Sequence, residues 1–370
     1  MKKYVLSYII FGCIAQTALA LDLDLDIAAG YDSNPFKLSD SFSAKNSAFI
    51  ESQVKLTQHL DQLRLRAGFK DRSYESKYND TNTSTWFTGI RYVEKHLLFG
   101  KKARSQIGIK YKQKDKTYVS RSSGEVGTFS GTTIEGRYDY SDWELKTKTK
   151  LKLSRSIDTT FKVRLNDRNY EDYAINGLSN FDYLQWSLAN EWSYSFAKND
   201  DVHAELSFTH RDFDDKRQNN LDGSVIAGTD LAYRTFGIEL GYARALNERW
   251  VFEIDSSYQS REDNGAGYYD QTNKEIKMSF GYAPTESFET QLSLGRQDKK
   301  YKNSPAFDPA NDGEPSKDGY YLKIKAEKAL SKKIDNSAIF ISLRYEEYDS
   351  SQESYKYDRL QSQVGVSTRF

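Results

Sequence analysis

Leu360-Gln-Ser-Gln-Val364-Gly-Val366-Ser-Thr368-Arg-Phe370 ends the chain, and its side chains alternate in polarity from the first residue to the last. Every second residue, counted from Leu360, tolerates an apolar medium, whereas the residues between them are polar or glycine. Successive side chains of a β-strand point to opposite faces, so a period of two predicts a strand with a different solvent on each face. The pattern recurs along most of the chain and predicts an all-β fold.

The alternation is clearest between Trp143 and Leu153, where the odd-numbered residues are apolar or threonine and the even-numbered ones are charged. A lysine or arginine that faces mid-bilayer hydrocarbon costs about 2–4 kcal/mol, so we expect the charged side of each strand to face an aqueous lumen. The pattern therefore predicts a transmembrane antiparallel β-barrel. A soluble β-sandwich is the alternative, but it does not account for the signal-peptide features of residues 1–20 or for the terminal Phe370.

The composition agrees with a barrel. The mean hydropathy is −0.77, and no apolar run after residue 20 approaches the roughly 18 residues that a membrane helix needs. Only half of each barrel strand has to be apolar, so a low average is expected. The 27 Tyr and 20 Phe, beside 5 Pro and 2 Met, favour strands over helices. A net charge of zero gives no electrostatic argument for nucleic-acid binding.

Residues 1–20 have the features of a secretory signal peptide. Lys2 and Lys3 precede a mostly apolar stretch, and Ala18-Leu19-Ala20 fits the small-x-small cleavage pattern. Cleavage there leaves a barrel of residues 21–370. The alternative is a lipoprotein signal ending at Cys13, although the apolar stretch before this cysteine is short. Cys13 is the only cysteine, so its removal excludes disulfides and thiol chemistry from the mature protein.

Polar connections of two lengths separate the alternating runs. Seven short turns are predicted at 59–62, 95–102, 156–159, 197–201, 245–248, 284–287 and 330–335. Eight longer loops are predicted at 32–46, 76–82, 119–142, 172–179, 214–228, 261–270, 300–317 and 349–356. They give 16 strands, with 14 or 18 as the neighbouring counts that imprecise boundaries allow. We expect the short turns on the periplasmic side and the long loops outside the cell.

The predicted lumen has two charged regions. Its basic wall consists of Arg104, Lys110, Lys112, Lys146, Lys148, Lys150, Lys152, Lys162 and Arg164. Its opposing acidic wall consists of Glu205, Glu239, Glu253, Asp255 and Glu289. Opposed charges in a pore attract anions to the basic side. The alternative is that these charges only keep the lumen hydrated.

The longest loop, 119–142, contains four glycines and is the third long loop in the chain. It either folds into the lumen as a constriction, by analogy with general porins, or stays outside the barrel.

The sequence predicts no catalytic, cofactor or metal site. Asp22, Asp24 and Asp26 share one face of the first strand, but carboxylates about 7 Å apart along a strand cannot converge on one ion alone. His210 lies close to Asp212 in an outward-facing strand end, and no serine motif accompanies the pair. We therefore expect a protein that is not an enzyme.

The terminal Phe370, with Val366 and Thr368, resembles the assembly signal at the end of Gram-negative outer-membrane barrels. The likeness implies outer-membrane lipid and the barrel-assembly machinery as partners. The opening Gly30-Tyr31-Asp32-Ser33-Asn34-Pro35-Phe36 resembles the start of an exopolysaccharide-associated family of outer-membrane barrels. Within this motif, Asp32 or Ser33 can cap the turn and Pro35 stops strand pairing.

The resemblance implies export of an exopolysaccharide, with a periplasmic export protein docked onto the short turns. The inward aromatic residues Phe87, Tyr183, Tyr321 and Phe340 would then let a hydrated glycan slide through. A general or anion-biased diffusion porin for small solutes is the alternative. In either case, the expected location is the outer membrane in the cell envelope of a Gram-negative bacterium.

Overall fold

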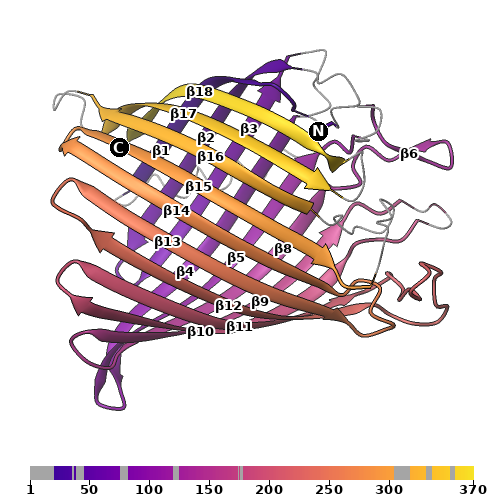
Figure 1. Cartoon of the computed structure of the whole chain (residues 1–370), viewed down its shortest axis with the longest axis horizontal. Coiled ribbons are helices and arrows are strands. Elements are labelled where there is room, and N and C mark those ends of the chain that lie inside the picture. Colours follow the sequence, from indigo (N-terminus) through magenta and orange to yellow (C-terminus); the bar gives the residue numbers. More distant parts are fainter. Residues whose placement is uncertain are drawn as a thin grey trace.

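The alternating strands close into one antiparallel barrel in the computed structural model (Figure 1). Sixteen strands form the ring, and the first strand is hydrogen-bonded to the last. The structure describes residues 21–35, 37–38, 46–75, 82–119, 125–173, 175, 178–303, 317–330, 336–350 and 355–370. The predicted fold class and count of 16 strands are confirmed. The predicted signal peptide, residues 1–20, lies outside the described residues.

The barrel strands are long enough to cross a bilayer at a tilt. They are β1 (Leu21–Asp32), β2 (Ser47–Leu60), β3 (Leu63–Tyr74), β4 (Thr83–Leu98), β5 (Lys101–Lys116), β8 (Tyr140–Lys152), β9 (Ile157–Tyr170), β10 (Tyr183–Ala197), β11 (Asp200–Phe213), β12 (Ala232–Ala245), β13 (Trp250–Asp263), β14 (Gln271–Thr285), β15 (Phe288–Tyr301), β16 (Lys317–Ala329), β17 (Ser337–Ser350) and β18 (Tyr357–Arg369). The short β6 (Thr128–Phe129) and β7 (Thr132–Thr133) pair only with each other.

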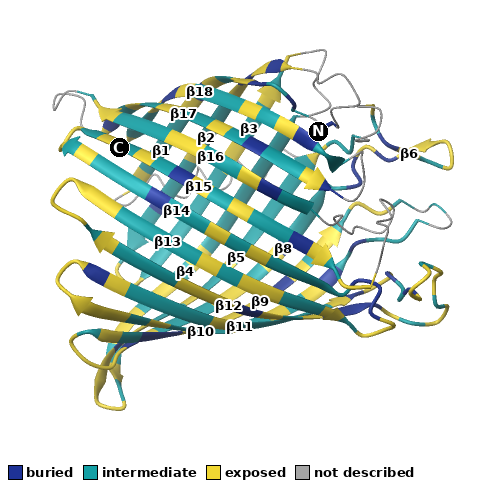
Figure 2. Cartoon of the chain, in the orientation of Figure 1, coloured by how far each residue is buried: buried dark blue, intermediate teal, exposed yellow. Residues whose placement is uncertain are grey.

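The strand register keeps the apolar residues on the outer face. Ile109 of β5, Leu145 of β8 and Leu165 of β9 lie directly beside one another. All three are exposed, as an outer face in contact with lipid requires. Figure 2 shows exposed and half-buried residues alternating along the strands in the same way.

Short turns and long loops lie at opposite ends of the barrel (Figure 1). The predicted seven turns and eight loops are confirmed, with boundaries shifted by a few residues. The expected turn 95–102 is only Phe99-Gly100, and the expected turn 156–159 is residues 153–156. Phe99 and Gly100 have φ values of 52° and 72°. Two residues with positive φ match the strand twist in a two-residue hairpin, so the flanking strands extend further than predicted.

Loop 119–142 begins and ends slightly earlier than expected, because β5 ends at Lys116 and β8 begins at Tyr140. Its β6–β7 hairpin projects beyond the end of the barrel (Figure 1). At the base of the loop, Arg137 donates a hydrogen bond of 2.7 Å to the carbonyl of Ser179 in the following loop. The β6–β7 hairpin of this loop therefore lies outside the lumen, in agreement with the second of the two alternatives.

The chain end closes the barrel. Phe370 and Leu23 exchange two main-chain hydrogen bonds of 2.9 and 3.1 Å. Above them, the apolar Ile27 lies beside Val366 on the outer face. The alternation of the last strand is thus used both to cover lipid-facing surface and to leave no unpaired sheet edge.

Candidate functional site

The strand register places the nine residues of the predicted basic wall on the inner face of β5, β8 and β9. Lys146 lies beside Arg164, Lys148 beside Lys162, and Arg104 beside Lys150. Like charges directly opposite each other on a sheet are destabilising unless acidic partners or water compensate them. The stability of the basic wall therefore depends on which of its cations have a carboxylate partner.

Four of the nine cations have carboxylate partners. Lys112 lies 3.0 Å from Asp142, Lys150 lies 2.8 Å from Asp158, and Arg164 lies 3.2 Å from Glu144. Lys162 lies 2.6 Å from Glu191 and 2.5 Å from Glu205. The other five make no ion pair with any residue that the structure describes, and they are Arg104, Lys110, Lys146, Lys148 and Lys152.

Three arginines that the sequence interpretation did not include join the unpaired cations. They are Arg64 and Arg66 on β3 and Arg91 on β4. The sequence pattern that predicts their inward position is the same alternation of polarity, in Leu63-Arg64-Leu65-Arg66 and in Ile90-Arg91-Tyr92. The basic wall thus begins two strands earlier than predicted.

These residues line a hollow of about 480 Å³ in the inner wall, which we call the basic hollow. Its charged lining residues are Lys55, Arg64, Arg66, Arg91, Lys110, Lys146, Lys148 and the single carboxylate Glu144. Gly89 and Gly108 make the room, because Gly89 lies beside Lys110 and Gly108 lies beside Arg91. A glycine next to each long cation leaves space where a second side chain would otherwise stand.

The basic hollow is short of negative charge. Glu144 is already engaged by Arg164, and Lys55 pairs with Asp24 on β1. The Nε atoms of Arg66 and Arg91 are buried, and among the described residues neither has a hydrogen-bond partner. A buried donor without a partner costs about 1–3 kcal/mol, so these two atoms add to the cost of gathering cations in this part of the wall.

One aromatic ring completes the hollow. Phe87 lines it, and the Lys110 ammonium lies 4.9 Å from the centroid of its ring. Tyr321 and Phe340 also face inward, with Arg344 and Lys325 at 5.5 and 5.8 Å from their ring centroids. Each ring therefore has a cation over it.

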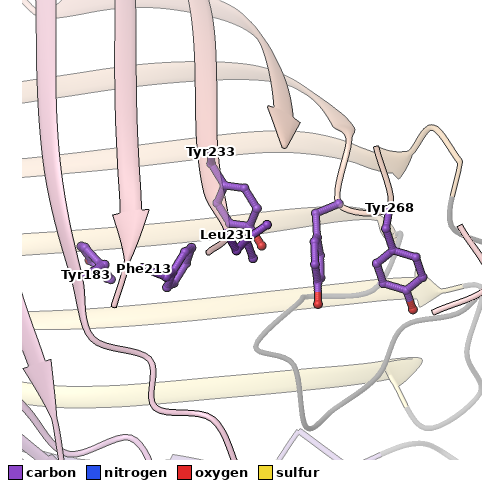
Figure 3. Close-up of a cluster of buried hydrophobic side chains, with 6 residues drawn as sticks. Tyr183, Phe213, Leu231, Tyr233 and Tyr268 are labelled. Atoms are coloured by element: carbon purple, nitrogen blue, oxygen red, sulfur yellow. The ribbon is translucent and has the colours of Figure 1, made fainter. Parts of the chain in front are cut away.

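Tyr183, the fourth predicted inward aromatic residue, is buried in a cluster at the long-loop end of the barrel. Its ring packs edge-on against Phe213, and the row of rings continues through Tyr233 to Tyr269 and Tyr268, with Leu231 in the same cluster (Figure 3). Arg211 lies 4.2 Å from the Tyr183 ring centroid. The register places Tyr183 on the inner face as predicted, but at 5% exposure its ring offers almost no surface to a glycan.

The predicted acidic residues are distributed over three places rather than one wall. Glu205 belongs with Lys162 of the basic wall. Glu253 and Glu289 line a second hollow of about 400 Å³, together with Glu248 and Glu327. Glu239 and Asp255 both lie near His203. β15, which carries Glu289, is diametrically opposite β5 in the strand order, so part of the acidic charge does face the basic wall.

The motif turn Tyr31-Asp32-Ser33-Asn34-Pro35 follows β1 in the chain and is hydrogen-bonded to β18. Asp32 is fully buried and accepts hydrogen bonds from the Asn34 main-chain N–H, the Tyr74 hydroxyl and the Arg359 guanidinium, at 3.1, 3.0 and 2.8 Å. The Ser33 hydroxyl accepts a bond of 2.7 Å from the Leu360 N–H. Asp32 thus caps the turn, as one of the two predicted options, whereas Ser33 bonds across to β18.

A second buried carboxylate, Glu346 on β17, extends this arrangement. It lies 2.9 Å from Arg344, 3.3 Å from Lys37 and 3.3 Å from Arg359. We call the set Asp32, Lys37, Tyr74, Arg344, Glu346 and Arg359 the seam network. Every charge in the seam network has an opposite charge as a neighbour. The network therefore stabilises the closure of the barrel.

The first-strand carboxylates and His210 also have local partners. Asp24 pairs with Lys55, and His59 lies 3.0 Å from Asp22. His210 lies 2.9 Å from Asp212 on the outer face. Asp22 and Asp24 thus lie on the lumenal face, each beside a basic residue of β2.

A closed barrel with an apolar exterior and a polar, charged interior is an outer-membrane β-barrel, because a bilayer accepts β-structure only when no strand edge is left open. Its location is the outer membrane of a Gram-negative bacterium. Within the described residues, no helix is long and apolar enough to span a membrane.

No family model matches the sequence, and no curated protein matches it either. Among solved structures, a bacterial polysaccharide outer membrane secretin is 11% identical, with a TM-score of 0.49 over 94% of this chain and 98% of that one. OprD of Pseudomonas aeruginosa is 11% identical, with a TM-score of 0.49 over 95% of each chain. An anion-selective porin from Comamonas acidovorans is 11% identical, with a TM-score of 0.48 over 95% and 99%. At this identity the likeness concerns the barrel alone.

Proposed function

We propose that this protein is an outer-membrane diffusion channel that favours anionic solutes. The observation that carries the proposal is the basic hollow, where seven cationic side chains and one carboxylate line about 480 Å³ of the inner wall. A lumen wall of one sign raises the local concentration of ions of the opposite sign.

The residues of the hollow also supply short-range contacts. Phosphate, sulfate and carboxylate groups accept charge-assisted hydrogen bonds from the guanidinium and ammonium groups that line the hollow. Arginine forks suit such planar or tetrahedral oxyanions better than single ammonium groups do. The expected solute is therefore a small molecule that carries one of these groups.

Export of an exopolysaccharide is the second candidate, and it is favoured by the width of the cationic surface. Cations cover the inner face from Arg64 on β3 to Arg164 on β9. An anionic polymer would contact several of them in turn, as a small solute would not. A periplasmic export protein docked onto the seven short turns is part of this second proposal.

Ion selectivity tests the first proposal. The purified barrel is reconstituted in a planar bilayer, and the reversal potential is measured under a salt gradient. We expect anion selectivity in the wild type and its loss in the double variant Lys146→Glu/Lys148→Glu. Lys274→Glu is the matched control, because Lys274 is exposed and lies beside Tyr258 on the outer face. A cation-selective wild type, or a double variant that matches the control, would contradict the proposal.

Deletion of the gene separates the second candidate from the first. Loss of surface polysaccharide with intracellular synthesis intact supports export, whereas unchanged surface polysaccharide rules it out. Reduced uptake of small anions without any change in polysaccharide leaves the diffusion channel as the function.

A further inference from the structure

His203, Glu239 and Asp255 form a cluster on the inner wall that the channel proposal does not use. They come from the adjacent strands β11, β12 and β13, close to the short-turn end of the lumen. The Nε2 atom of His203 lies 3.6 Å from Glu239 Oε1 and 3.6 Å from Asp255 Oδ1. One ligand atom from each residue lies within 4.8 Å of the other two.

A glycine creates the space in which these side chains meet. Gly241 stands between His203 and Asp255 in the strand register. A Cβ atom at position 241 would lie 2.0 Å from His203 Cε1 and 2.6 Å from Asp255 Oδ1. The imidazole and the carboxylate therefore reach toward each other across β12 through a gap that any other residue would fill.

The separations suit a metal ion better than direct hydrogen bonds. A distance of 3.6 Å is too long for a hydrogen bond between nitrogen and oxygen. Zn²⁺ binds imidazole nitrogen and carboxylate oxygen at about 2.0–2.2 Å, so two of its tetrahedral ligands lie about 3.4 Å apart. The two His203 distances are close to that edge length, and the two carboxylate oxygens lie within 4.8 Å of each other.

One ligand atom also lacks a partner. Asp255 Oδ1 is buried and accepts no hydrogen bond from any residue that the structure describes. The nearest cation, Lys277, lies 3.8 Å from the other oxygen, Oδ2, and leaves Oδ1 directed at His203. A cation between these three residues would provide the missing partner.

The charge balance points to a divalent ion. Glu239 and Asp255 bring two negative charges to the cluster, and the neighbouring Glu205 is held by Lys162. One imidazole and two carboxylates are a ligand set that Zn²⁺ accepts, and three protein ligands leave its fourth position open.

We propose that His203, Glu239 and Asp255 bind one divalent transition-metal ion of the Zn²⁺ type, with its open coordination position toward the lumen. The ion would tie together three neighbouring strands near the short-turn end. It would also add positive charge to a part of the wall that is otherwise acidic.

Titration with Zn²⁺ tests the proposal on the purified full barrel in detergent. We expect one high-affinity ion per wild-type chain by calorimetry, and about 100-fold weaker binding in His203→Ala and Asp255→Asn, the upper end of what the loss of even an outer-shell partner costs. Gly241→Ala should weaken binding in the same way, because its Cβ meets only the flexible ends of the two ligand side chains. Heat-modifiable migration on gels confirms that each variant is folded.

His59→Ala is the matched control, because His59 also faces the lumen at the short-turn end and lies 3.0 Å from Asp22. It should leave Zn²⁺ binding unchanged. Two outcomes would overturn the proposal. One is a wild type that binds no more Zn²⁺ than His203→Ala, which would leave the cluster without a metal. The other is a His59→Ala variant that loses the site. Neither outcome depends on whether the barrel conducts anions.

Discussion

The seam network and the basic hollow are built from the same kinds of side chain and lie on the same inner surface, but they treat charge differently. In the seam network, the buried carboxylates Asp32 and Glu346 are surrounded by Arg344, Arg359 and Lys37. In the basic hollow, seven cations share a lining with one carboxylate. The charges of the seam network are therefore paired with one another, whereas most cations of the basic hollow have no carboxylate beside them.

The physical cost explains the difference. A charge buried in the wall has to be paired, because removal of one partner leaves the other uncompensated at a cost of about 3–5 kcal/mol. A charge that faces an aqueous lumen is screened and needs no partner for stability. Compensated charge therefore stabilises the closure of the barrel, whereas uncompensated charge at the lumen stays available to solutes, as the proposed channel requires.

Asp32→Ala should have the largest effect, because it leaves Arg359 buried without its main partner. We expect the free energy of unfolding to fall by about 3–5 kcal/mol, measured by urea titration of the barrel folded into lipid vesicles. Asp212→Ala is the control and should change it by less than about 0.5 kcal/mol, because Asp212 is exposed. If the Asp32→Ala barrel were as stable as the control, charge pairing in the seam network would not contribute to stability, and the contrast with the basic hollow would be wrong.

Asn34→Ala tests the hydrogen bonds of the same turn without changing its charge. The Asn34 amide is buried, donates to the carbonyl of Leu38 at 2.8 Å and accepts from the Leu38 N–H at 2.8 Å. Its loss should lower the free energy of unfolding by about 1–3 kcal/mol. An effect equal to that of Asp32→Ala would mean that turn geometry, and not charge pairing, stabilises the seam.

Lys146→Ala should affect selectivity and not stability. One charge acts on a solute about 5 Å away in water with an energy of about 0.8 kcal/mol, so the ratio of anion to cation permeability should fall two- to fourfold. The free energy of unfolding should change by less than about 0.5 kcal/mol, because no described residue pairs with Lys146. Lys112→Ala sharpens the comparison, since Lys112 pairs with the buried Asp142 and should lower stability more than Lys146→Ala does.

Salt should produce the smallest and most general difference. Raising the ionic strength from about 0.1 to 1 M shortens the screening length from about 10 to 3 Å. The anion preference of the wild type should decline accordingly, while the stability that Asp32 provides should stay nearly constant. Equal salt sensitivity of reversal potential and stability would show that both regions are exposed to the same solvent.

The sequence predicted the barrel well because alternation is a local signal. Strand count, turn order and the inner position of Lys146 follow from a period of two and need no long-range information. The same alternation is present in Leu63-Arg64-Leu65-Arg66, although the predicted basic wall began only at Arg104. The basic hollow itself depends on which residues the register places beside Gly89 and Gly108.

The other features depend on contacts between distant residues. Asp32 was predicted to cap a turn, but its partners Tyr74 and Arg359 are brought to it by the closed sheet. The burial of Tyr183 could not be predicted, because loop packing leaves no period in the sequence. His203, Glu239 and Asp255 come together only because Gly241 separates two of them in the register.

The seam network also has a consequence for how the barrel assembles. Asp32 and Arg359 are 327 residues apart in the chain, so their contact forms only after every intervening strand has been laid down. A barrel that closes before β18 is in place, or with β18 out of register on β1, would leave Asp32 away from Arg359. It would then bury Asp32 without a counter-charge. The pair thus discriminates against incomplete rings, and a weakened seam is expected to appear first as slow, error-prone insertion.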